Sequence, residues 1–113
     1  MKYLYLPVVI FILFISDLQS QTWTIQQQGI TKGFTRKMFF VDANTGYATS
    51  SDVIGGFSLV YKTTNGGSNW VSYQTSCTGA LYGVSFPNAN TGYICSFNEE
   101  NKKTTNGGVN WVE

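Results

Sequence analysis

The carboxylates are the side chains of this sequence best suited to catalysis, because a two-carboxylate glycosidase needs an Asp or Glu on each side of the sugar. They lie in or beside polar turns, at Asp42, Asp52, Glu99 and Glu100. Asp42 belongs to a phrase whose second copy has Asn88 in the same place, which indicates a turn residue. Asp52 has no acidic partner near it in the sequence, and Glu99 and Glu100 are expected to be solvated. The sequence therefore predicts no catalytic pair.

Other kinds of site lack the side chains that they require. The chain has no histidine, so it offers no imidazole base and no Cys/His cluster for zinc. The Asn-Gly-Gly turns lack the Lys-Ser/Thr pair of a phosphate loop. Seven basic and six acidic residues nearly cancel, whereas a nucleic-acid-binding protein needs a basic face. We therefore predict no catalytic residues, no cofactor, no metal and no nucleic-acid partner.

The N-terminal residues have the layout of a secretory signal peptide. Lys2 supplies a positive charge, residues 3–15 (YLYLPVVIFILFI) are uncharged and apolar, and residues 16–20 are polar and end in the small Ser20. The apolar run of 13 residues is shorter than the ~20 that a membrane helix needs. We predict a signal peptide over residues 1–20 and a secreted, cell-surface or periplasmic protein without other membrane contact. An uncleaved anchor is the alternative.

Two sequence phrases each occur twice in the chain, and their spacing indicates a structural repeat. FVDANTGY at 40–47 returns as FPNANTGY at 86–93, and KTTNGGSNW at 62–70 returns as KTTNGGVNW at 103–111. A repeat of about 40–47 residues fits either a four-stranded propeller blade or a two-helix repeat. Short β-branched and aromatic stretches between turn residues, without helical periodicity, favour the blade.

The predicted fold class is therefore all-β, with antiparallel four-stranded blades of a β-propeller, about two of which are present in an incomplete ring. A lone strand at 22–27 opens the propeller region, residues 21–113. Unit one (37–75) carries five extra residues in the loop 52–56, and unit two (80–113) is truncated. Rings need about four to eight blades, so we expect an N-terminal fragment of a longer protein. The predicted strands are 37–42, 47–51, 57–64, 69–75, 81–86, 92–97, a short strand at about 101–102, and one beginning at 110.

Each residue type in the repeated phrases has a physical role. The Asn side chain can bond back to its own turn, paired glycines permit positive φ, and the Trp covers the hairpin with a large apolar face. The turn of the first phrase leaves Gly46 free to take positive φ. The predicted structural repeat residues are Thr63, Asn65, Gly66, Gly67, Trp70, Thr104, Asn106, Gly107, Gly108, Trp111, Asn44, Gly46, Tyr47, Asn90, Gly92 and Tyr93.

The Asn-Gly-Gly phrase resembles the Asp-box, or BNR repeat, Ser/Thr-x-Asp-x-Gly-x-Thr-Trp, with Asn in place of Asp and of the second Thr. Together with the FxxANTGY phrase it resembles the repeat of the photosystem II assembly and stability factor family of propellers. The resemblance covers residues 22–113 and implies a propeller. It leaves function open, because Asp-boxes occur in sialidases, xyloglucan-cleaving glycosidases and non-enzymes.

The function expected from this resemblance is that of an exported, non-catalytic repeat module that binds an unknown protein or carbohydrate. The alternative is the N-terminal part of a sialidase-like or xyloglucanase-like glycoside hydrolase. A sialidase needs three arginines, and this chain has only Arg36. Near the loop 52–56, the side chains of Tyr61, Tyr73 and Tyr82 either contribute to a binding surface or line the interfaces between blades, and we favour the interfaces.

Two cysteines, Cys77 and Cys95, would be permitted to form a disulfide in an exported chain. If a hairpin turns at residues 87–90, Cys95 lies opposite about residue 83, and Cys77 falls beyond the end of the strand. A Cys77–Cys95 disulfide would therefore require the preceding loop to fold back. Two unpaired thiols are the alternative.

Overall fold

The computed structural model describes residues 29–51 and 58–113. The predicted signal peptide (1–20), the predicted lone strand (22–27) and the loop 52–56 lie outside these residues. Within the described residues no helix is long and apolar enough to cross a membrane.

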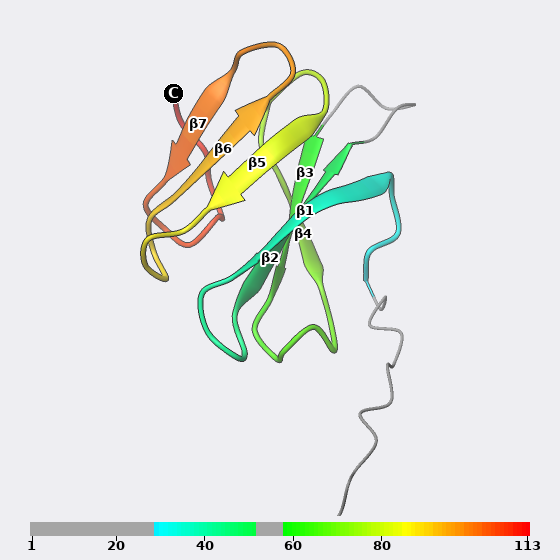
Figure 1. Cartoon of the computed structure of the whole chain (residues 1–113), viewed down its shortest axis with the longest axis vertical. Coiled ribbons are helices and arrows are strands. Elements are labelled where there is room, and N and C mark those ends of the chain that lie inside the picture. The colour runs from blue at the N-terminus through cyan, green and yellow to red at the C-terminus, as the bar shows by residue number, and fades with distance from the viewer. Residues whose placement is uncertain (1–28, 52–57) are drawn as a thin grey trace, which may run out of the picture.

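Two antiparallel sheets make up the described fold, which confirms the all-β prediction (Figure 1). Each sheet is a meander in which strands that are neighbours in the sequence are neighbours in space. The strands of the first sheet are β1 (Phe34–Phe40), β2 (Gly46–Ser51), β3 (Ser58–Thr63) and β4 (Val71–Gln74). Those of the second are β5 (Leu81–Ser85), β6 (Gly92–Ser96) and β7 (Asn101–Thr104).

The strand boundaries differ from the predicted ones mainly at the two ends of the fold. β1 begins at Phe34, three residues earlier than expected, and its register with β2 shifts between Thr35 and Lys37. The strand predicted from residue 110 is reduced to one bridge, in which Lys103 and Val112 exchange backbone hydrogen bonds of 2.7 and 2.9 Å. The second sheet is therefore a three-stranded version of the first with the beginning of a fourth strand.

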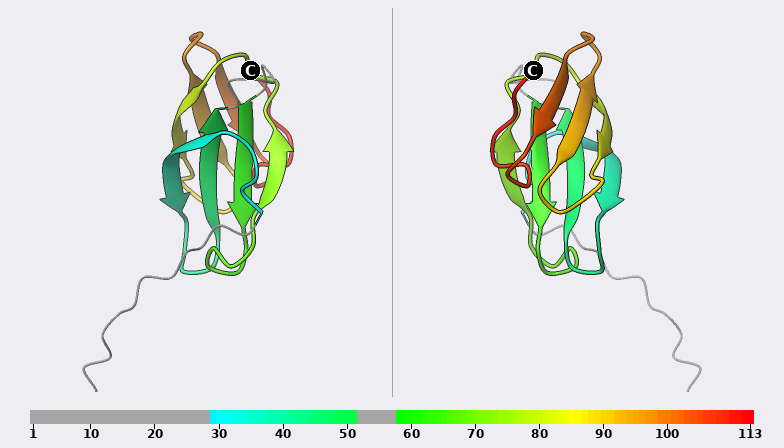
Figure 2. Two further views of the ribbon diagram at one scale, coloured as in Figure 1. Left: turned by 90° about the vertical axis from the view of Figure 1, so that its right-hand side faces the viewer. Right: turned by 90° about the vertical axis from the view of Figure 1, so that its left-hand side faces the viewer.

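The sheets pack face to face, with β5 against β1 and β2, as the two layers of Figure 2 show. The core between them is apolar, which removes hydrocarbon surface from water and drives the packing. Tyr47 and Val60 supply this core from the first sheet, and Val84, Phe86 and Ile94 supply it from the second.

The two sheets differ in how many of their faces are covered. All six residues of β2 are buried, because the second sheet covers one of its faces and a cluster that includes Ile30 covers the other. Along β6 buried and exposed residues alternate, so that Tyr93 and Cys95 point to an open face. We call this open side of β5–β7 the outer face of the second sheet.

The glycine of the FxxANTGY phrase is required for a reason other than the one the sequence suggested. Neither Gly46 nor Gly92 has positive φ, so that expectation is wrong. Instead, a Cβ atom on Gly46 would lie 2.6 Å from the Phe40 ring, and one on Gly92 would lie 2.4 Å from the Phe86 ring. The absence of a Cβ atom at these positions lets the aromatic ring lie directly on the neighbouring strand.

Candidate functional site

The turn between β3 and β4 is closed by side-chain hydrogen bonds. The Thr63 hydroxyl accepts the N–H of Gly67 at 2.9 Å and donates to the Asn65 side-chain oxygen at 3.0 Å. That oxygen also accepts the N–H of Asn69 at 2.9 Å. Gly66 and Gly67 both have positive φ, which glycine adopts without strain.

The second copy of the phrase has the same geometry. Thr104 accepts the N–H of Gly108 at 2.9 Å and donates to Asn106 at 3.0 Å, and Asn106 accepts the N–H of Asn110 at 3.0 Å. Gly107 and Gly108 again have positive φ. Because the Thr and Asn oxygens are occupied by their own turn in both copies, these residues have a structural role.

The tryptophans that end the phrases are buried but differ in one polar contact. Each stands edge-on to a phenylalanine, Trp70 to Phe40 at 6.1 Å and Trp111 to Phe86 at 6.0 Å between ring centroids. The Trp111 indole N–H donates to the carbonyl of Gly108 at 3.1 Å. The Trp70 indole N–H is buried with no acceptor among the described residues. Among the described residues Trp111 therefore has a hydrogen bond that Trp70 lacks, and a buried donor without an acceptor costs free energy.

Asp42, the first of the candidate carboxylates, is a turn residue. Its Oδ1 accepts the backbone N–H groups of Asn44 and Thr45, both at 2.7 Å. These hydrogen bonds, that of Thr45 first, lower the pKa of the Asp42 carboxyl. Asn88 accepts the N–H groups of Asn90 and Thr91 in the same way, at 3.0 and 2.8 Å.

The two phrases of each unit are also tied to each other. The N–H of Gly66 donates to the carbonyl of Asn44 at 2.9 Å, and the N–H of Gly107 donates to that of Asn90 at 2.8 Å. Asn44 and Asn90 thus contribute their backbone rather than their side chains. In each unit the turn after its first strand is fastened to the turn after its third.

Glu100 is held by the protein instead of being only solvated, which corrects the expectation for this residue. Its carboxylate accepts the backbone N–H of Thr78 at 2.7 Å and the Thr78 hydroxyl at 3.1 Å. The Asn98 side-chain amide donates to the carbonyl of the same threonine at 3.0 Å. Glu99 is exposed and has a φ of 61° in the turn before β7. Glu100 therefore fixes the segment that joins the two sheets.

The contact between the two units centres on Tyr47. Its ring stacks on Phe86 with the centroids 3.6 Å apart and the planes within 7°. Its hydroxyl donates to the carbonyl of Gly107 at 3.1 Å, and burial raises its pKa. The Lys62 ammonium lies 5.5 Å from the centre of the Tyr47 ring and donates to the same carbonyl at 2.9 Å.

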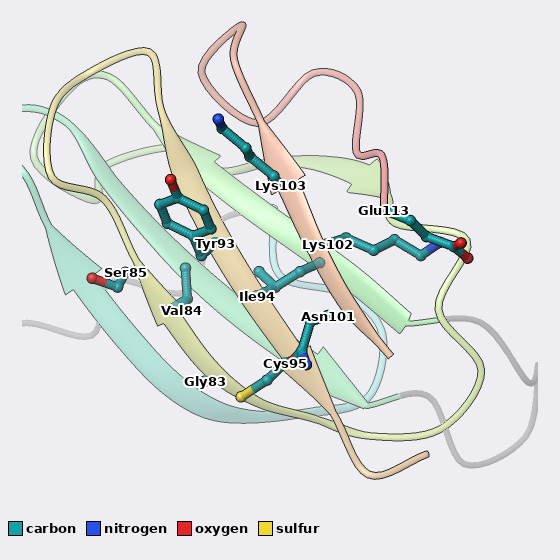
Figure 3. Close-up of a pocket in the computed structure, with 10 residues that line it drawn as sticks. All are labelled: Gly83, Val84, Ser85, Tyr93, Ile94, Cys95, Asn101, Lys102, Lys103 and Glu113. Atoms are coloured by element: carbon teal, nitrogen blue, oxygen red, sulfur yellow. The ribbon is translucent and has the colours of Figure 1, made fainter. Parts of the chain in front are cut away.

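A cavity of about 610 Å³ lies along the outer face of the second sheet (Figure 3). Tyr93 and Lys103 stand beside each other at one end, with the ammonium 5.9 Å from the ring centre. Lys102 forms an ion pair with Glu113 at 3.7 Å. The described residues contain no group of three His, Cys, Asp or Glu that could hold a metal ion. The lining residues are Gly83, Val84, Ser85, Tyr93, Ile94, Cys95, Asn101, Lys102, Lys103 and Glu113.

A second candidate site is an exposed cluster formed by Arg36, Tyr82 and Phe97, which we call the aromatic cluster. The Arg36 guanidinium carbon lies 5.1 Å from the centre of the Tyr82 ring, and its Nε donates to the Ser51 hydroxyl at 3.1 Å. The rings of Tyr82 and Phe97 are 6.1 Å apart. Tyr82 is 48% exposed and Phe97 is 68% exposed, so the cluster offers two aromatic faces to solvent.

The three tyrosines singled out in the sequence are therefore distributed over different environments. Tyr61 is buried, and its hydroxyl bonds to the backbone of Lys32. Tyr73 is half-buried, and only Tyr82 is well exposed. Phe97 was predicted only as the last residue of the strand 92–97, because a single sequence does not show that its ring meets Tyr82 from another strand.

Cys77 and Cys95 are free thiols, so the disulfide that the sequence permits is not formed. Cys77 is buried in the core between the sheets, whereas Cys95 lies opposite Gly83 on the outer face. The second sheet itself separates the two sulfur atoms. Burial raises the pKa of the Cys77 thiol and makes it less reactive.

The outer face of the second sheet and the aromatic cluster are thus the candidate binding surfaces of the described part of the chain. Asp52 and the loop that contains it lie outside the described residues. The similarity to Asp-box propellers rests on the repeated phrases alone, because comparison with protein-family models, with curated proteins and with solved structures finds no match to this chain.

Proposed function

We propose that this protein is an exported, non-catalytic repeat module of the β-propeller type that binds a protein or a carbohydrate through the aromatic cluster. In this architecture each sheet is one blade. The repeat architecture is supported by the equivalent hydrogen bonds in the two Asn-Gly-Gly turns, where corresponding distances agree to within 0.1 Å. The binding role is supported by one observation, the exposure of two aromatic rings beside an arginine.

The chemistry of the cluster suits a carbohydrate or a polar protein surface. Exposed aromatic faces pack on the C–H faces of sugars and on apolar side chains, and they lose little conformational entropy on binding. Arg36 keeps N–H groups beyond the one bonded to Ser51, and a guanidinium can donate a fork of hydrogen bonds to a carboxylate or to hydroxyl groups. Ring stacking and directed hydrogen bonds together would give the site its selectivity.

A non-catalytic role agrees with the state of the carboxylates. Asp42 and Glu100 accept backbone N–H groups in turns, and neither is a member of the aromatic cluster. In Asp42 this arrangement lowers the pKa, which makes the carboxyl a poor proton donor near neutral pH. Both groups therefore serve the fold.

The test is binding of the full exported chain to an array of polysaccharides and to immobilised cell-surface proteins. Tyr82→Ala and Phe97→Ala should each reduce retention on the bound target about tenfold or more, since an aromatic anchor contributes ~2 kcal/mol or more. Val109→Ala is the matched control, because Val109 is also exposed but lies in the Asn-Gly-Gly turn. Equal retention of all three variants would refute the assigned surface.

A further inference from the structure

Two Asn-Gly dipeptides in the repeated turns carry a chemistry that the proposed binding function does not use. They are Asn65-Gly66 and Asn106-Gly107. The side-chain amide of an asparagine can be attacked by the backbone nitrogen of the next residue, and glycine obstructs this approach least because it has no Cβ atom. Both asparagines are exposed, so that water can reach their side chains.

In both turns the attacking nitrogen is engaged in a hydrogen bond. The N–H of Gly66 donates to the carbonyl of Asn44 at 2.9 Å, and that of Gly107 donates to the carbonyl of Asn90 at 2.8 Å. The side-chain oxygen of each attacked asparagine accepts a backbone N–H, at 2.9 and 3.0 Å. The reaction therefore requires a local opening that breaks the tie between the two turns of the unit.

The two turns differ in what covers the glycine. The carbonyl of Gly107 accepts the Tyr47 hydroxyl at 3.1 Å and the Lys62 ammonium at 2.9 Å, and both donors belong to the first unit. Gly107 is buried, whereas the equivalent Gly66 is exposed. To open, the second turn must therefore break these two contacts in addition to the hydrogen bonds that both turns share.

We propose that Asn65 is a deamidation site of this protein, and that Tyr47 and Lys62 protect the equivalent Asn106. The nitrogen of Gly66 gives its proton to a solvent base and bonds to the side-chain carbonyl carbon of Asn65. The bond from that carbon to the amide nitrogen breaks, and the nitrogen leaves as ammonia after taking a proton from solvent. Water then opens the succinimide ring, at the side-chain carbonyl to give aspartate or at the main-chain carbonyl to give isoaspartate.

The two products affect the turn differently. Aspartate at position 65 keeps an oxygen where the Thr63 hydroxyl and the N–H of Asn69 now bond to Asn65. Isoaspartate places the former side-chain methylene in the main chain, which moves Gly66 away from the carbonyl of Asn44. Only the isoaspartate product therefore loosens the tied end of the first sheet. The inference uses the turns alone and does not depend on the aromatic cluster or on any ligand.

The flanking strands act in the opposite direction to the protecting contacts. In the first unit the turn leads into β4, which pairs with β3 at four positions, whereas in the second unit it leads to the single bridge between Lys103 and Val112. If fraying of the last strand controlled the reaction, Asn106 would react first. If the contacts from the first unit control it, Asn65 reacts first, so the order of the two rates decides between these causes.

The test is incubation of the full folded chain at mildly alkaline pH, with aspartate and isoaspartate at each site measured by mass spectrometry of separated peptides. Each rate is divided by the rate of the same site in the urea-unfolded chain, where both sites lie in the sequence KTTNGG. The normalised rate should be about tenfold or more higher at Asn65 than at Asn106. A tenfold difference is about 1.4 kcal/mol, which two hydrogen bonds, one from a charged group, can supply.

A pair of tyrosine variants shows whether the contact between units causes the protection. Tyr47→Phe removes the hydroxyl that donates to Gly107 but keeps the ring, so deamidation of Asn106 should become severalfold faster while that of Asn65 is unchanged. Tyr61→Phe is the matched control, because it removes the hydroxyl of an equally buried tyrosine that bonds to a different part of the first unit. It should leave Asn106 protected.

Each of three outcomes would overturn the proposal. The first is a normalised rate at Asn106 that equals or exceeds the rate at Asn65. The second is an unmodified Asn65 in the folded chain after both sites of the unfolded chain have been converted completely. The third is an acceleration at Asn106 that is as large in Tyr61→Phe as in Tyr47→Phe, which would attribute it to general destabilisation. None of these outcomes bears on retention of a ligand by the aromatic cluster, so the two proposals fail in different assays.

Discussion

Replacing the two equivalent glycines by alanine should have unequal effects, although the sequence around them is the same. In Gly92→Ala the new methyl group would lie 2.4 Å from two carbon atoms of the Phe86 ring, whereas carbon atoms in contact are ~3.5–4.0 Å apart. The Phe86 ring cannot move away, because Tyr47 stacks on it at 3.6 Å and Trp111 stands against it at 6.0 Å. Overpacking of this kind costs about 1–3 kcal/mol.

Gly46→Ala creates a similar overlap, 2.6 Å from the Phe40 ring, but that ring is 43% exposed and can turn toward solvent. Alanine also gains about 0.5–1 kcal/mol over glycine in a strand, since it loses less conformational entropy on folding. The two effects nearly cancel, so Gly46→Ala should leave stability almost unchanged.

The assay is urea unfolding of the full chain, followed by tryptophan fluorescence. The free energy of unfolding should be lower by about 1–3 kcal/mol for Gly92→Ala, with an unchanged urea dependence. In a domain of this size a loss of 1 kcal/mol lowers Tm by about 4–8 °C. The cost of Gly92→Ala should shrink in a Phe86→Leu background, because the smaller side chain relieves the overlap. If Gly46→Ala is as destabilising as Gly92→Ala, the packing explanation is wrong.

Three further predictions concern single side chains. Asp42→Asn should keep the turn. In the wild type, the ionised Asp42 adds stability that is lost as pH falls from the ordinary pKa of 3.8 toward the lowered pKa of the folded state. The variant should lack this part of the pH dependence when the urea midpoint of unfolding is measured at a series of acid pH values. Trp111→Phe should lower the free energy of unfolding in urea more than Trp70→Phe, because Trp111 loses its hydrogen bond to Gly108 whereas the Trp70 indole has no acceptor in residues 29–51 and 58–113; equal costs would contradict this. A thiol reagent should label Cys95 at once and Cys77 only on unfolding, and a mass change on reduction would reveal a disulfide.

Local chemistry made the repeated turns predictable from the sequence. Asn65 and Asn106 lie next to paired glycines, so both the bond-back of the amide oxygen and the positive φ could be expected from neighbouring residues alone. The same is true of Asp42 and Asn88, which bond to amides two and three residues away. Hydrogen bonds between residues fewer than five positions apart can therefore be predicted from the residue types in the sequence.

Contacts between distant residues could not be predicted in this way. The need for glycine at 92 comes from the Phe86 ring on the neighbouring strand, and the role of Glu100 depends on Thr78, which is 22 residues away. The aromatic cluster joins Arg36 and Phe97 across two sheets. A single sequence gives the strands and turns, but it does not say which side chains the packing of the two sheets brings together.

The tie between the two turns of each unit has a consequence for how such units can vary. It fixes one end of the sheet, through Gly66 and Asn44 in the first unit and Gly107 and Asn90 in the second. The connections after β2, β4 and β6 leave from the opposite end, and the length difference between the units falls in one of them, the loop 52–56. The loop 52–56 can therefore vary in length without disturbing the strand register, whereas the connections after β4 and β6 are held to each other by the hydrogen bonds between Glu100 and Thr78. The aromatic cluster lies at the same end of the sheets, so changes in this loop occur on the side of the fold where we propose binding.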